Sequence, residues 1–280
     1  MKTNYSFRYA ANPADVKSYD TEKLRNEFLI ENLFTENEIN LVYSMYDRFI
    51  VGGAMPVNER LNLETIDYLK SENFLDRREL GIVNVGGKGE VYVDGEVFEL
   101  DKKEALYVGK GKKEILFVSK DAENPALFYL NSAPAHEAYP TKKIGKEEAV
   151  VINLGDQENC NKRVLNKLIV NELVQTNQLQ MGLTELLPGN IWNTMPAHTH
   201  SRRMEAYFYF DLTEGQTISH FMGQTHETRH IFMQNNQAVL SPEWSIHSGA
   251  GTSNYSFIWG MAGENLDYGD MDICPPNELK

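Results

Sequence analysis

The chain has 280 residues, which suffices for about two domains of roughly 100–200 residues or one large β domain with a sizeable core. Its formal net charge of −13 argues against nucleic acid as the main partner, because phosphate binding needs a basic patch. No apolar run approaches the roughly 18 residues that cross a bilayer, and the first residues lead into no apolar signal segment. We therefore expect a cytoplasmic protein with neither a membrane nor a nucleic-acid partner.

Strand patterns dominate, and helix signals are few. The best helix candidate covers residues 20–29, with Asp20 or Thr21 as the cap, and a second candidate lies near residues 146–148. Residues 90–100 alternate in character around Asp94-Gly95, a dipeptide that favours a type I′ hairpin turn because it accepts positive φ. Short apolar runs at residues 105–108 and 115–118 follow, separated by glycines. This meander of short strands predicts an all-β fold with few helices.

The order of short motifs repeats along the chain. In each half a Met-Pro dipeptide precedes an Arg-Arg pair with a nearby glutamate, then a strand, a turn and an apolar run. The paired segments are Met55-Pro56 with Met195-Pro196, residues 77–79 with 202–205, and residues 105–108 with 238–241. Chance similarity of short peptides is the alternative, but the shared order favours two barrels. We expect an N-terminal arm at 1–20, a first barrel at 21–140 and a second barrel at 141–280.

Histidine is confined to the later part of the chain. A histidine-rich metal site is therefore possible only in the second barrel, and the first barrel is expected to serve structure or assembly. The seven histidines are His136, His198, His200, His220, His226, His230 and His247.

Four residues of the second barrel predict a metal centre. His198 and His200 lie two apart, so on a strand their imidazoles point to the same side. Glu205 follows after enough residues for a tight turn or bulge into the next strand, and we expect His247 on a later strand that barrel closure brings alongside. Three neutral imidazoles and one carboxylate suit zinc, manganese, iron or nickel.

The spacing of these ligands resembles the cupin pattern, in which a first motif supplies His-x-His and a spaced Glu, and a second supplies Pro and a later His. Pro242 and His247 match the second motif, but Trp244 stands at its usual glycine position. The leading glycine of the first motif is replaced by Trp192. The ligand positions are thus intact on an altered glycine scaffold. The resemblance implies a double-stranded β-helix repeated twice, a bicupin.

Further residues are candidates for lining the pocket or binding substrate. If Glu205 faces inward, strand parity directs Tyr207 and Tyr209 inward as well; the same argument applies to Trp192 and Thr194 beside the two histidines. The alternative for these aromatic rings is ordinary barrel core. Arg202 and Arg203 are candidates for binding a substrate carboxylate, with a salt bridge or subunit contact as the alternative. Arg229 and Lys110 are further cations considered for that contact.

Longer segments make the resemblance more specific. Over about residues 20–272 the chain resembles the 5-keto-4-deoxyuronate isomerases, also called 4-deoxy-L-threo-5-hexosulose-uronate ketol-isomerases. Among the segments that carry it are residues 24–29, 76–81, 105–111, 134–143, 181–185, 192–196, 202–205, 227–230, 244–249 and 257–260.

This resemblance implies one Zn²⁺ per chain on His198, His200, Glu205 and His247, although spacing alone leaves manganese and iron open. It implies a cytoplasmic homohexamer in pectin and polyuronate degradation. It also implies a small-molecule substrate derived from uronates: the reaction would convert 5-dehydro-4-deoxy-D-glucuronate to 3-deoxy-D-glycero-2,5-hexodiulosonate.

The catalytic base is not fixed by the sequence. Glu185 and Glu227 are candidates, with His226 and His230 behind them. Proton transfer through an enediolate, a metal-guided hydride shift and a purely structural metal remain alternatives. Two other functions also remain open: another metal-dependent cupin enzyme, such as an iron dioxygenase, and a non-catalytic sugar-binding bicupin.

Overall fold

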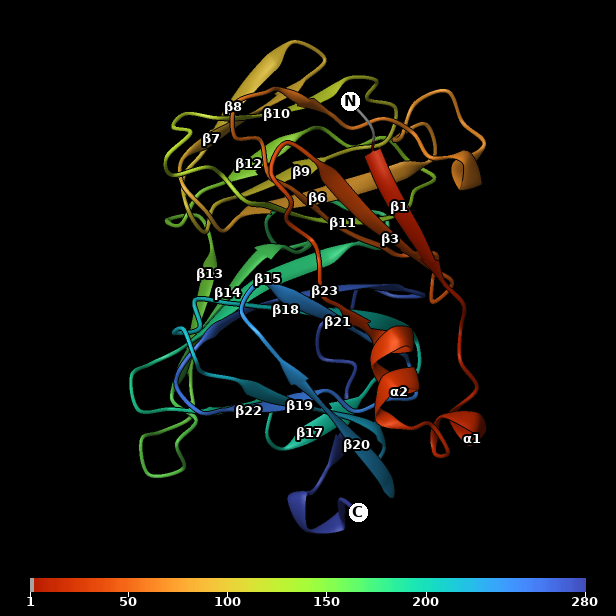
Figure 1. Cartoon of the computed structure of the whole chain (residues 1–280), viewed down its shortest axis with the longest axis vertical. Helices are drawn as coiled ribbons and strands as arrows, with labels where there is room; N and C mark the ends of the chain where they lie inside the picture. Colours follow the sequence, from red (N-terminus) through yellow and green to blue (C-terminus); the bar gives the residue numbers. More distant parts are fainter. Residues whose placement is uncertain (1–2) are drawn as a thin grey trace. The chain divides into compact units, whose positions relative to one another are not determined.

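The computed structural model describes residues 3–280, and nearly all of its regular structure is β (Figure 1). The chain divides into two compact units. The first comprises the described part of Met1–Phe7 with Asn32–Ala149 and Leu168–Met181; the second comprises Arg8–Glu31, Val150–Lys167 and Gly182–Lys280. The predicted division into an N-terminal arm at 1–20 and barrels at 21–140 and 141–280 stays a prediction.

The first unit is built on a seven-stranded sheet in the order β1-β3-β4-β11-β6-β9-β12 and a four-stranded sheet in the order β5-β10-β7-β8. The strands of the larger sheet are β1 (Thr3–Arg8), β3 (Ile39–Ser44), β4 (Ile50–Ala54), β6 (Arg78–Asn84), β9 (Ala105–Val108), β11 (Phe128–Pro134) and β12 (Lys142–Ile144). The smaller sheet contains β5 (Leu61–Asn62), β7 (Gly89–Val93), β8 (Glu96–Leu100) and β10 (Ile115–Ser119). A 3₁₀ turn, η1 (Asp67–Leu69), follows β5.

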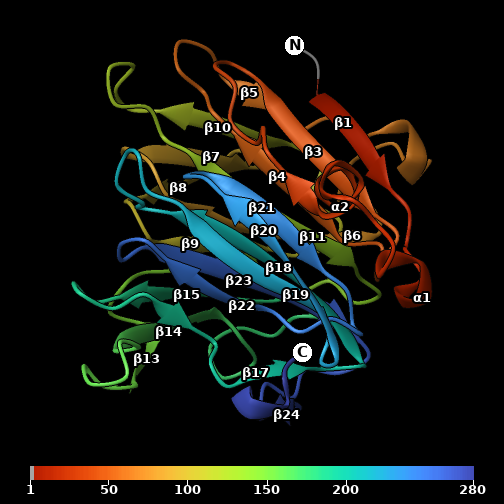
Figure 2. The same cartoon turned by 60° about the horizontal axis from the view of Figure 1, so that its bottom comes forward.

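The second unit repeats this plan, with sheets ordered β13-β14-β15-β23-β18-β21-β2 and β16-β22-β19-β20. Its larger sheet contains β2 (Leu29–Ile30), β13 (Val150–Leu154), β14 (Arg163–Ile169), β15 (Gln180–Leu186), β18 (Arg203–Phe210), β21 (Gln237–Ser241) and β23 (Ser256–Gly263). Its smaller sheet contains β16 (Trp192–Asn193), β19 (Ile218–Gln224), β20 (Glu227–Met233) and β22 (Ser248–Gly251). β17 (Ala197–Thr199) pairs with β24 (Asp272–Cys274) near the C-terminus (Figure 2). A 3₁₀ turn, η2 (Pro276–Glu278), follows β24.

The matching strand orders confirm the predicted all-β, two-barrel architecture. Position by position, each strand of one large sheet has a counterpart in the other. In particular β6 corresponds to β18. β6 lies between β11 and β9, and β18 lies between β23 and β21. β9 and β21 each follow the hairpin of their unit, and β11 and β23 are the penultimate strands. Arg78 and Arg203 begin these two strands, so Leu80 occupies in the first barrel the position that Glu205 occupies in the second.

The local predictions are mostly confirmed. Helix α2 (Thr21–Phe28) begins after Asp20, whose carboxylate accepts a hydrogen bond from the Lys23 backbone at 2.8 Å. It follows the short α1 (Pro13–Val16) and packs on β20 and β21 (Figure 1). Asp94 and Gly95 adopt φ of 49° and 86° in the turn between β7 and β8, as the hairpin predicted.

The helix predicted near residues 146–148 is wrong. The chain turns there, and the Glu148 carboxylate accepts a hydrogen bond from the Gly145 backbone at 3.1 Å. The side chain thus satisfies a backbone donor of the turn, which is the competing use of a polar residue that propensity alone does not weigh. No helix in the described part of the chain is long and apolar enough to cross a membrane.

The two barrel interiors differ in polarity. The first is filled by a continuous apolar cluster that includes Leu80, Ile82, Val91 and Phe117. The second buries polar groups in the corresponding space, among them His200, Glu205, His220 and His247.

Candidate metal centre

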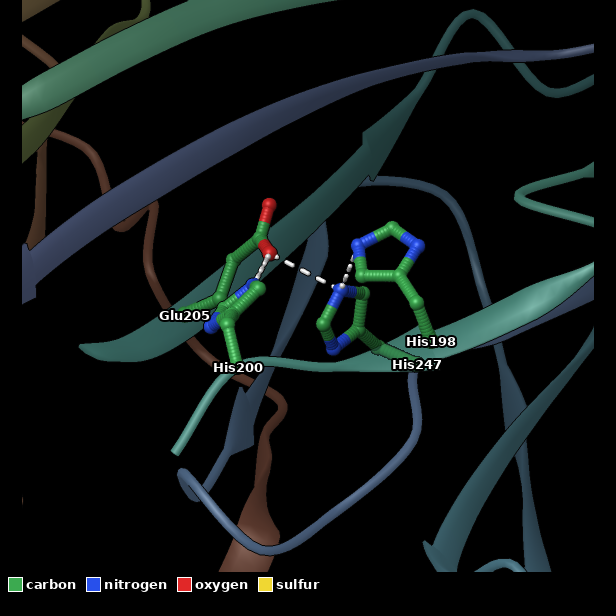
Figure 3. A group of neighbouring side chains, drawn as sticks. All are labelled: His198, His200, Glu205 and His247. Carbon is green, nitrogen blue, oxygen red and sulfur yellow. Dashed lines mark hydrogen bonds and ion pairs between the residues drawn. The ribbon is translucent and has the colours of Figure 1, made fainter. Parts of the chain in front are cut away.

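Three separate segments bring the four predicted ligands together (Figure 3). His198 lies on β17 and His200 in the turn that follows it, while Glu205 lies on β18. His247 comes from the loop directly before β22, and not from a strand as the sequence suggested. Pairing of Glu205 with Ser241 on β21 sets the carboxylate beside this loop.

The ligand atoms converge on one point. One atom from each residue lies within 4.8 Å of the other three. The Glu205 Oε2 atom is 2.9 Å from His200 Nε2 and 3.0 Å from His247 Nε2. The Nε2 atoms of His247 and His198 are themselves 3.0 Å apart. At such a distance at most one of the two nitrogens carries a proton, so at least one lone pair faces the centre.

Hydrogen bonds behind the rings orient two of the imidazoles. His200 Nδ1 lies 3.0 Å from the backbone oxygen of Arg203, which can only accept, so Nδ1 donates. In the neutral ring this leaves a lone pair on Nε2, toward the other ligands. His247 Nδ1 lies 3.2 Å from the Ser241 hydroxyl. Such support of the distal nitrogen is what metal-binding histidines ordinarily have.

The surroundings set the charge of the group. Burial tends to raise the pKa of Glu205, but the neighbouring His247 and His200 outweigh it and hold that pKa well below its usual range. Burial, reinforced by His247, lowers the pKa of His198 to about 3. Burial also acts to lower the pKa of His200, yet the hydrogen bond and charge of Glu205 prevail and raise it. Near neutral pH the group therefore offers an anionic carboxylate and a neutral imidazole at His198.

Donor types, convergence and tautomers all fit a divalent transition metal. Nitrogen donors with a carboxylate suit zinc, manganese, iron or nickel better than calcium or magnesium, which prefer oxygen. The closest contacts join the Nε2 atoms of two histidines, and Nε2 atoms to the Glu205 Oε2 atom. A cation between these atoms would be bound by their lone pairs together.

A cavity of 270 Å³ opens onto this group, near the lower end of the range for small-ligand sites. Three residues of its apolar wall, Phe257, Trp259 and Met261, come from β23, the penultimate strand of the barrel. The polar groups on the wall besides the ligands are Arg163, Thr184, Thr194, Tyr207 and Tyr268. Thr194 Oγ1 and the Tyr207 hydroxyl lie 2.9 Å apart, which fixes the tyrosine. Glu205 is the one carboxylate among the described residues that line this cavity.

Arg163 gives the cavity a cation. It begins β14, and its Nη1 donates to the Asn161 backbone oxygen at 2.8 Å. The described residues form no ion pair with it, and its other guanidinium nitrogens have no protein partner among them. Burial lowers its pKa, opposed by the nearby Tyr207, Tyr268 and Tyr255. A half-buried guanidinium without a carboxylate favours an anionic ligand.

Trp259 is a second group with unused hydrogen-bonding capacity. Its buried Nε1 has no partner within residues 3–280, although it lies on the cavity wall. The ring fits because residue 182 is glycine: a Cβ there would come within 2.0 Å of Trp259 Cζ2. A buried, unpaired donor at a cavity wall is a position for a ligand oxygen.

The residues predicted to bind substrate lie in different environments. Tyr207 lines the cavity, and Tyr209 packs behind it with its hydroxyl 2.8 Å from His220 Nδ1. Arg202 is bound to Asp270, with Nε donating to Oδ2 at 2.6 Å. Arg203 is fully buried and donates to backbone oxygens of Asp267 and Asp270. Neither arginine lines the cavity, because each already satisfies groups of the barrel rim.

The candidate bases lie outside the cavity lining. Glu185 follows Thr184 on β15, on the opposite face, and accepts from Asn166 at 3.3 Å. Glu227 is exposed on β20 and paired with Arg229 at 2.8 Å. His230 is exposed on the same strand. Their catalytic roles stay predictions.

Three other predicted residues also lie apart from this cavity. His226 is exposed, with Nδ1 facing a backbone oxygen near the C-terminus. Trp192 stacks on Phe221, and Lys110 belongs to the first unit.

The sequence reasoning missed Arg163, Trp259 and Tyr268. Strand parity was available for Trp259, because Phe257, Trp259 and Met261 alternate along β23 and pair with Tyr209, Tyr207 and Glu205. No comparable local signal marks Arg163 or Tyr268, since only the folded barrel brings them to the cavity.

Comparison with known proteins agrees with this site. Residues 28–273 match the model of the KduI/IolB family. The chain is 62% identical to a 4-deoxy-L-threo-5-hexosulose-uronate ketol-isomerase of Formosa agariphila over 280 residues, covering 100% of both chains. It is 61% identical, again over 100% of both, to the ketol-isomerase 1 of that name from Bacteroides thetaiotaomicron.

Solved structures extend the likeness of the fold. An IolB-like protein from Salmonella typhimurium superposes with a TM-score of 0.65 at 16% identity, over 80% of this chain and 86% of that one. An oxalate decarboxylase from Lactobacillus farciminis gives 0.55 at 9% identity, over 78% of each chain. These similarities support the bicupin fold. With the full-length identity to curated relatives and the family match, they establish that the chain belongs to the KduI/IolB family.

Proposed function

We propose that this chain is a ketol isomerase that converts 5-dehydro-4-deoxy-D-glucuronate to 3-deoxy-D-glycero-2,5-hexodiulosonate. The observation that carries the proposal is one cavity that joins the His₃-Glu group to an unpaired cation, Arg163. A uronate-derived substrate has a carboxylate at one end and a carbonyl beside a hydroxyl at the other. The cavity offers a partner for each end. The names of the relatives at 62% and 61% identity support the same reaction.

We propose one Zn²⁺ per chain, held by His198, His200, Glu205 and His247, with manganese and iron as alternatives. When bound, such an ion polarises the carbonyl and hydroxyl oxygens and stabilises the negative charge that develops on them. The chain's own contribution is a set of rings whose Nδ1 atoms are held from behind, so that the ligand atoms are pre-positioned.

Arg163 is proposed to bind the substrate carboxylate through its free guanidinium nitrogens. Tyr207 and Tyr268 keep their protons, because burial is the main cause that raises the pKa of each hydroxyl, and they can donate to substrate oxygens. Phe257, Met261 and the Trp259 ring exclude water from one side of the bound sugar acid. This orientation places the carbonyl end, and not the carboxylate, toward the four ligands.

In the reaction a hydrogen moves from the hydroxyl-bearing carbon to the neighbouring carbonyl carbon, and a proton moves between the two oxygens. Transfer as a proton through an enediolate and transfer as a hydride remain the two routes. Running the reaction in D₂O separates them: solvent deuterium enters the product at carbon in the first route and stays out in the second, unless the proton is shielded from solvent.

The wider setting is proposed from the family resemblance. It comprises a cytoplasmic homohexamer, acting on a small uronate-derived molecule in pectin and polyuronate degradation. The first barrel, which lacks histidine ligands, would then serve structure and assembly. A monomeric mass in light scattering at micromolar concentration would contradict the hexamer.

The test of function is an isomerase assay on the products of unsaturated-uronate breakdown, with metal content and oxygen uptake measured on the same preparation. We expect turnover that depends on metal and consumes no oxygen. Oxygen uptake coupled to substrate loss would instead favour a dioxygenase. Substrate binding without turnover in the metal-loaded protein would favour a sugar-binding bicupin.

A further inference from the structure

The first barrel contains a cavity of its own, of 510 Å³, at the end where β6 begins and β11 ends. Three cations line it: Arg77, Arg78 and Lys110. No Asp or Glu occurs among the described residues of its lining. In a chain whose net charge is −13, a cavity that gathers three cations and no carboxylate is a local reversal of sign.

Arg78 is the innermost of these cations and is 4% exposed. Its Nε donates to the Ser132 hydroxyl at 3.0 Å, and its Nη2 donates to the backbone oxygens of Arg48 and Ser132 at 2.6 and 2.8 Å. Nη1 has no partner within residues 3–280, and no carboxylate forms an ion pair with the group. A guanidinium this deeply buried is costly unless its charge is compensated.

The second barrel provides an internal comparison for this arginine pair. Arg202 and Arg203 occupy the corresponding positions before and at the start of β18. There Asp270 binds Arg202 through both oxygens, and its backbone oxygen accepts from Arg203. In the first barrel the hydrogen bonds that Arg77 and Arg78 donate go only to neutral oxygens, and no carboxylate among the described residues binds the pair directly as Asp270 does in the second barrel.

The remaining walls are suited to a sugar. Tyr43 and Tyr68 lie on the cavity and belong to a stack with Phe7, whose ring centroid is 4.6 Å from that of Tyr68. Tyr68 is 52% exposed, so the stack still presents aromatic surface. On another side Lys110 Nζ donates to the His136 backbone oxygen at 3.0 Å, which leaves two of its three protons for a ligand.

We propose that the first barrel binds a small carboxylated sugar in this cavity, with the carboxylate on Arg77, Arg78 and Lys110 and the ring beside Tyr43 and Tyr68. Paired cations match a carboxylate's two oxygens, and the aromatic rings match the apolar face of a pyranose. The first barrel is then a second ligand-binding module, distinct from the metal cavity of the second barrel. This site does not depend on the proposed isomerase function.

Equilibrium dialysis with labelled D-glucuronate tests the site, with all proteins carrying Arg163→Ala to weaken binding at the metal cavity. The test variant adds Arg77→Ala and Lys110→Ala. Arg78 is kept because it is buried and its guanidinium joins the backbone oxygens of Arg48 and Ser132. Arg77 is exposed and holds only the backbone of one turn, at Leu69 and Lys70. Lys112→Ala is the matched control, since Lys112 faces Asp94 at 3.6 Å and does not line the cavity. Circular dichroism and light scattering verify fold and assembly for each protein.

We expect one D-glucuronate per chain in the Arg163→Ala background and at least about tenfold weaker binding in the test variant, equivalent to about 1.4 kcal/mol. The Lys112 control should stay within about twofold of the background, and neutral D-glucose should bind at least about tenfold more weakly. The proposal is overturned if D-glucuronate does not bind the Arg163→Ala background. It is also overturned if D-glucuronate binds the background and the test variant equally well. Inorganic phosphate that binds as tightly as D-glucuronate overturns the sugar assignment. A change in assembly mass with unchanged D-glucuronate binding shows that the cations hold a partner chain instead.

Discussion

The two barrels share one strand order but use their interiors in opposite ways. At the position where β18 places Glu205, β6 places Leu80, and the following inward residues are Tyr207 and Ile82. The first barrel thus closes on an apolar cluster, whereas the second leaves room for a carboxylate, three histidines and a cavity. The fold itself does not determine the chemistry; a few side chains do, one of them on an equivalent strand and the three histidines on β17 and in the turn and loop beside it.

Among the changes that test this comparison, removal of a proposed metal ligand should have the largest effect on metal content and on kcat. We expect His198→Ala, His200→Ala and His247→Ala each to lose most of the metal and at least about 10³-fold in kcat, because the ion accounts for several kcal/mol of charge stabilisation. Glu205→Gln should also hold the ion more loosely, since it removes the ligand charge. Metal analysis and kinetics on the same samples measure both effects.

Circular dichroism separates a catalytic metal from a structural one in that series. The spectra should stay close to wild type, and the exposed His226→Ala should keep full metal and activity. If every ligand variant unfolds, the ion is structural. A ligand variant with full metal and activity removes that residue from the site.

The reverse change, Leu80→Glu, should damage the first barrel. Leu80 is 1% exposed within an apolar cluster, so a carboxylate there would be buried without a cation or ligand partners. We expect a loss of more than about 3 kcal/mol of unfolding free energy and a fall in Tm of roughly 10 °C. Leu80→Met, similar in volume, should cost less than about 1.5 kcal/mol. Calorimetric scans that show no difference between the two variants would mean that the first interior tolerates charge.

Arg163→Ala should lower kcat/KM measurably, but by less than the loss of the metal does. A charge-assisted contact of about 1.5–3 kcal/mol corresponds to roughly 10- to 100-fold in kcat/KM. The change should fall mainly on KM if the carboxylate is held equally in ground and transition states. Arg202→Ala is the matched control, because Asp270 already binds that side chain. A larger KM effect at Arg202 than at Arg163 would favour the assignment made from the sequence.

The pH dependence of metal affinity should show the smallest effect. Protons compete with the ion for the imidazole lone pairs, so affinity falls as pH decreases. Because Glu205 raises the pKa of His200, this competition begins at a higher pH for His200 than for His198, whose pKa is lowered to about 3. Below the pKa of His200 we expect a loss of about tenfold per pH unit for one displaced proton. Titrations with a metal-chelator buffer from neutral to acidic pH check this, and a flat profile would contradict it.

The sequence predicted the barrels and the convergence of the four candidate ligands for clear physical reasons. Alternation, the Asp94-Gly95 turn and the Asp20 cap are local signals, and each is confirmed. The His-x-His spacing also brought His198 and His200 to one site as predicted, although only His198 lies on a strand and His200 lies in the turn that follows. Residues 146–148 show where local propensity fails, because a turn used the side chain of Glu148.

Long-range placement could not be predicted in this way. Arg202 and Arg203 are neighbours of the candidate ligands in the sequence. Only the fold shows that both guanidinium groups already donate hydrogen bonds, to the Asp270 carboxylate and to nearby backbone oxygens. Arg163, distant in sequence from every ligand, reaches the cavity through the pairing of β14 within the sheet. The second cavity, in the first barrel, depends likewise on the antiparallel pairing that brings the start of β6 beside the end of β11.

The most direct test of the whole account is metal stoichiometry measured together with isomerase turnover, on the wild-type chain and on His247→Ala. The account predicts one ion per chain and turnover in the wild type, and joint loss of ion and turnover in a variant that stays folded. Two ions per chain, with the extra one in the first barrel, would contradict the division between the barrels. Full turnover in metal-free protein would contradict the role of the metal centre.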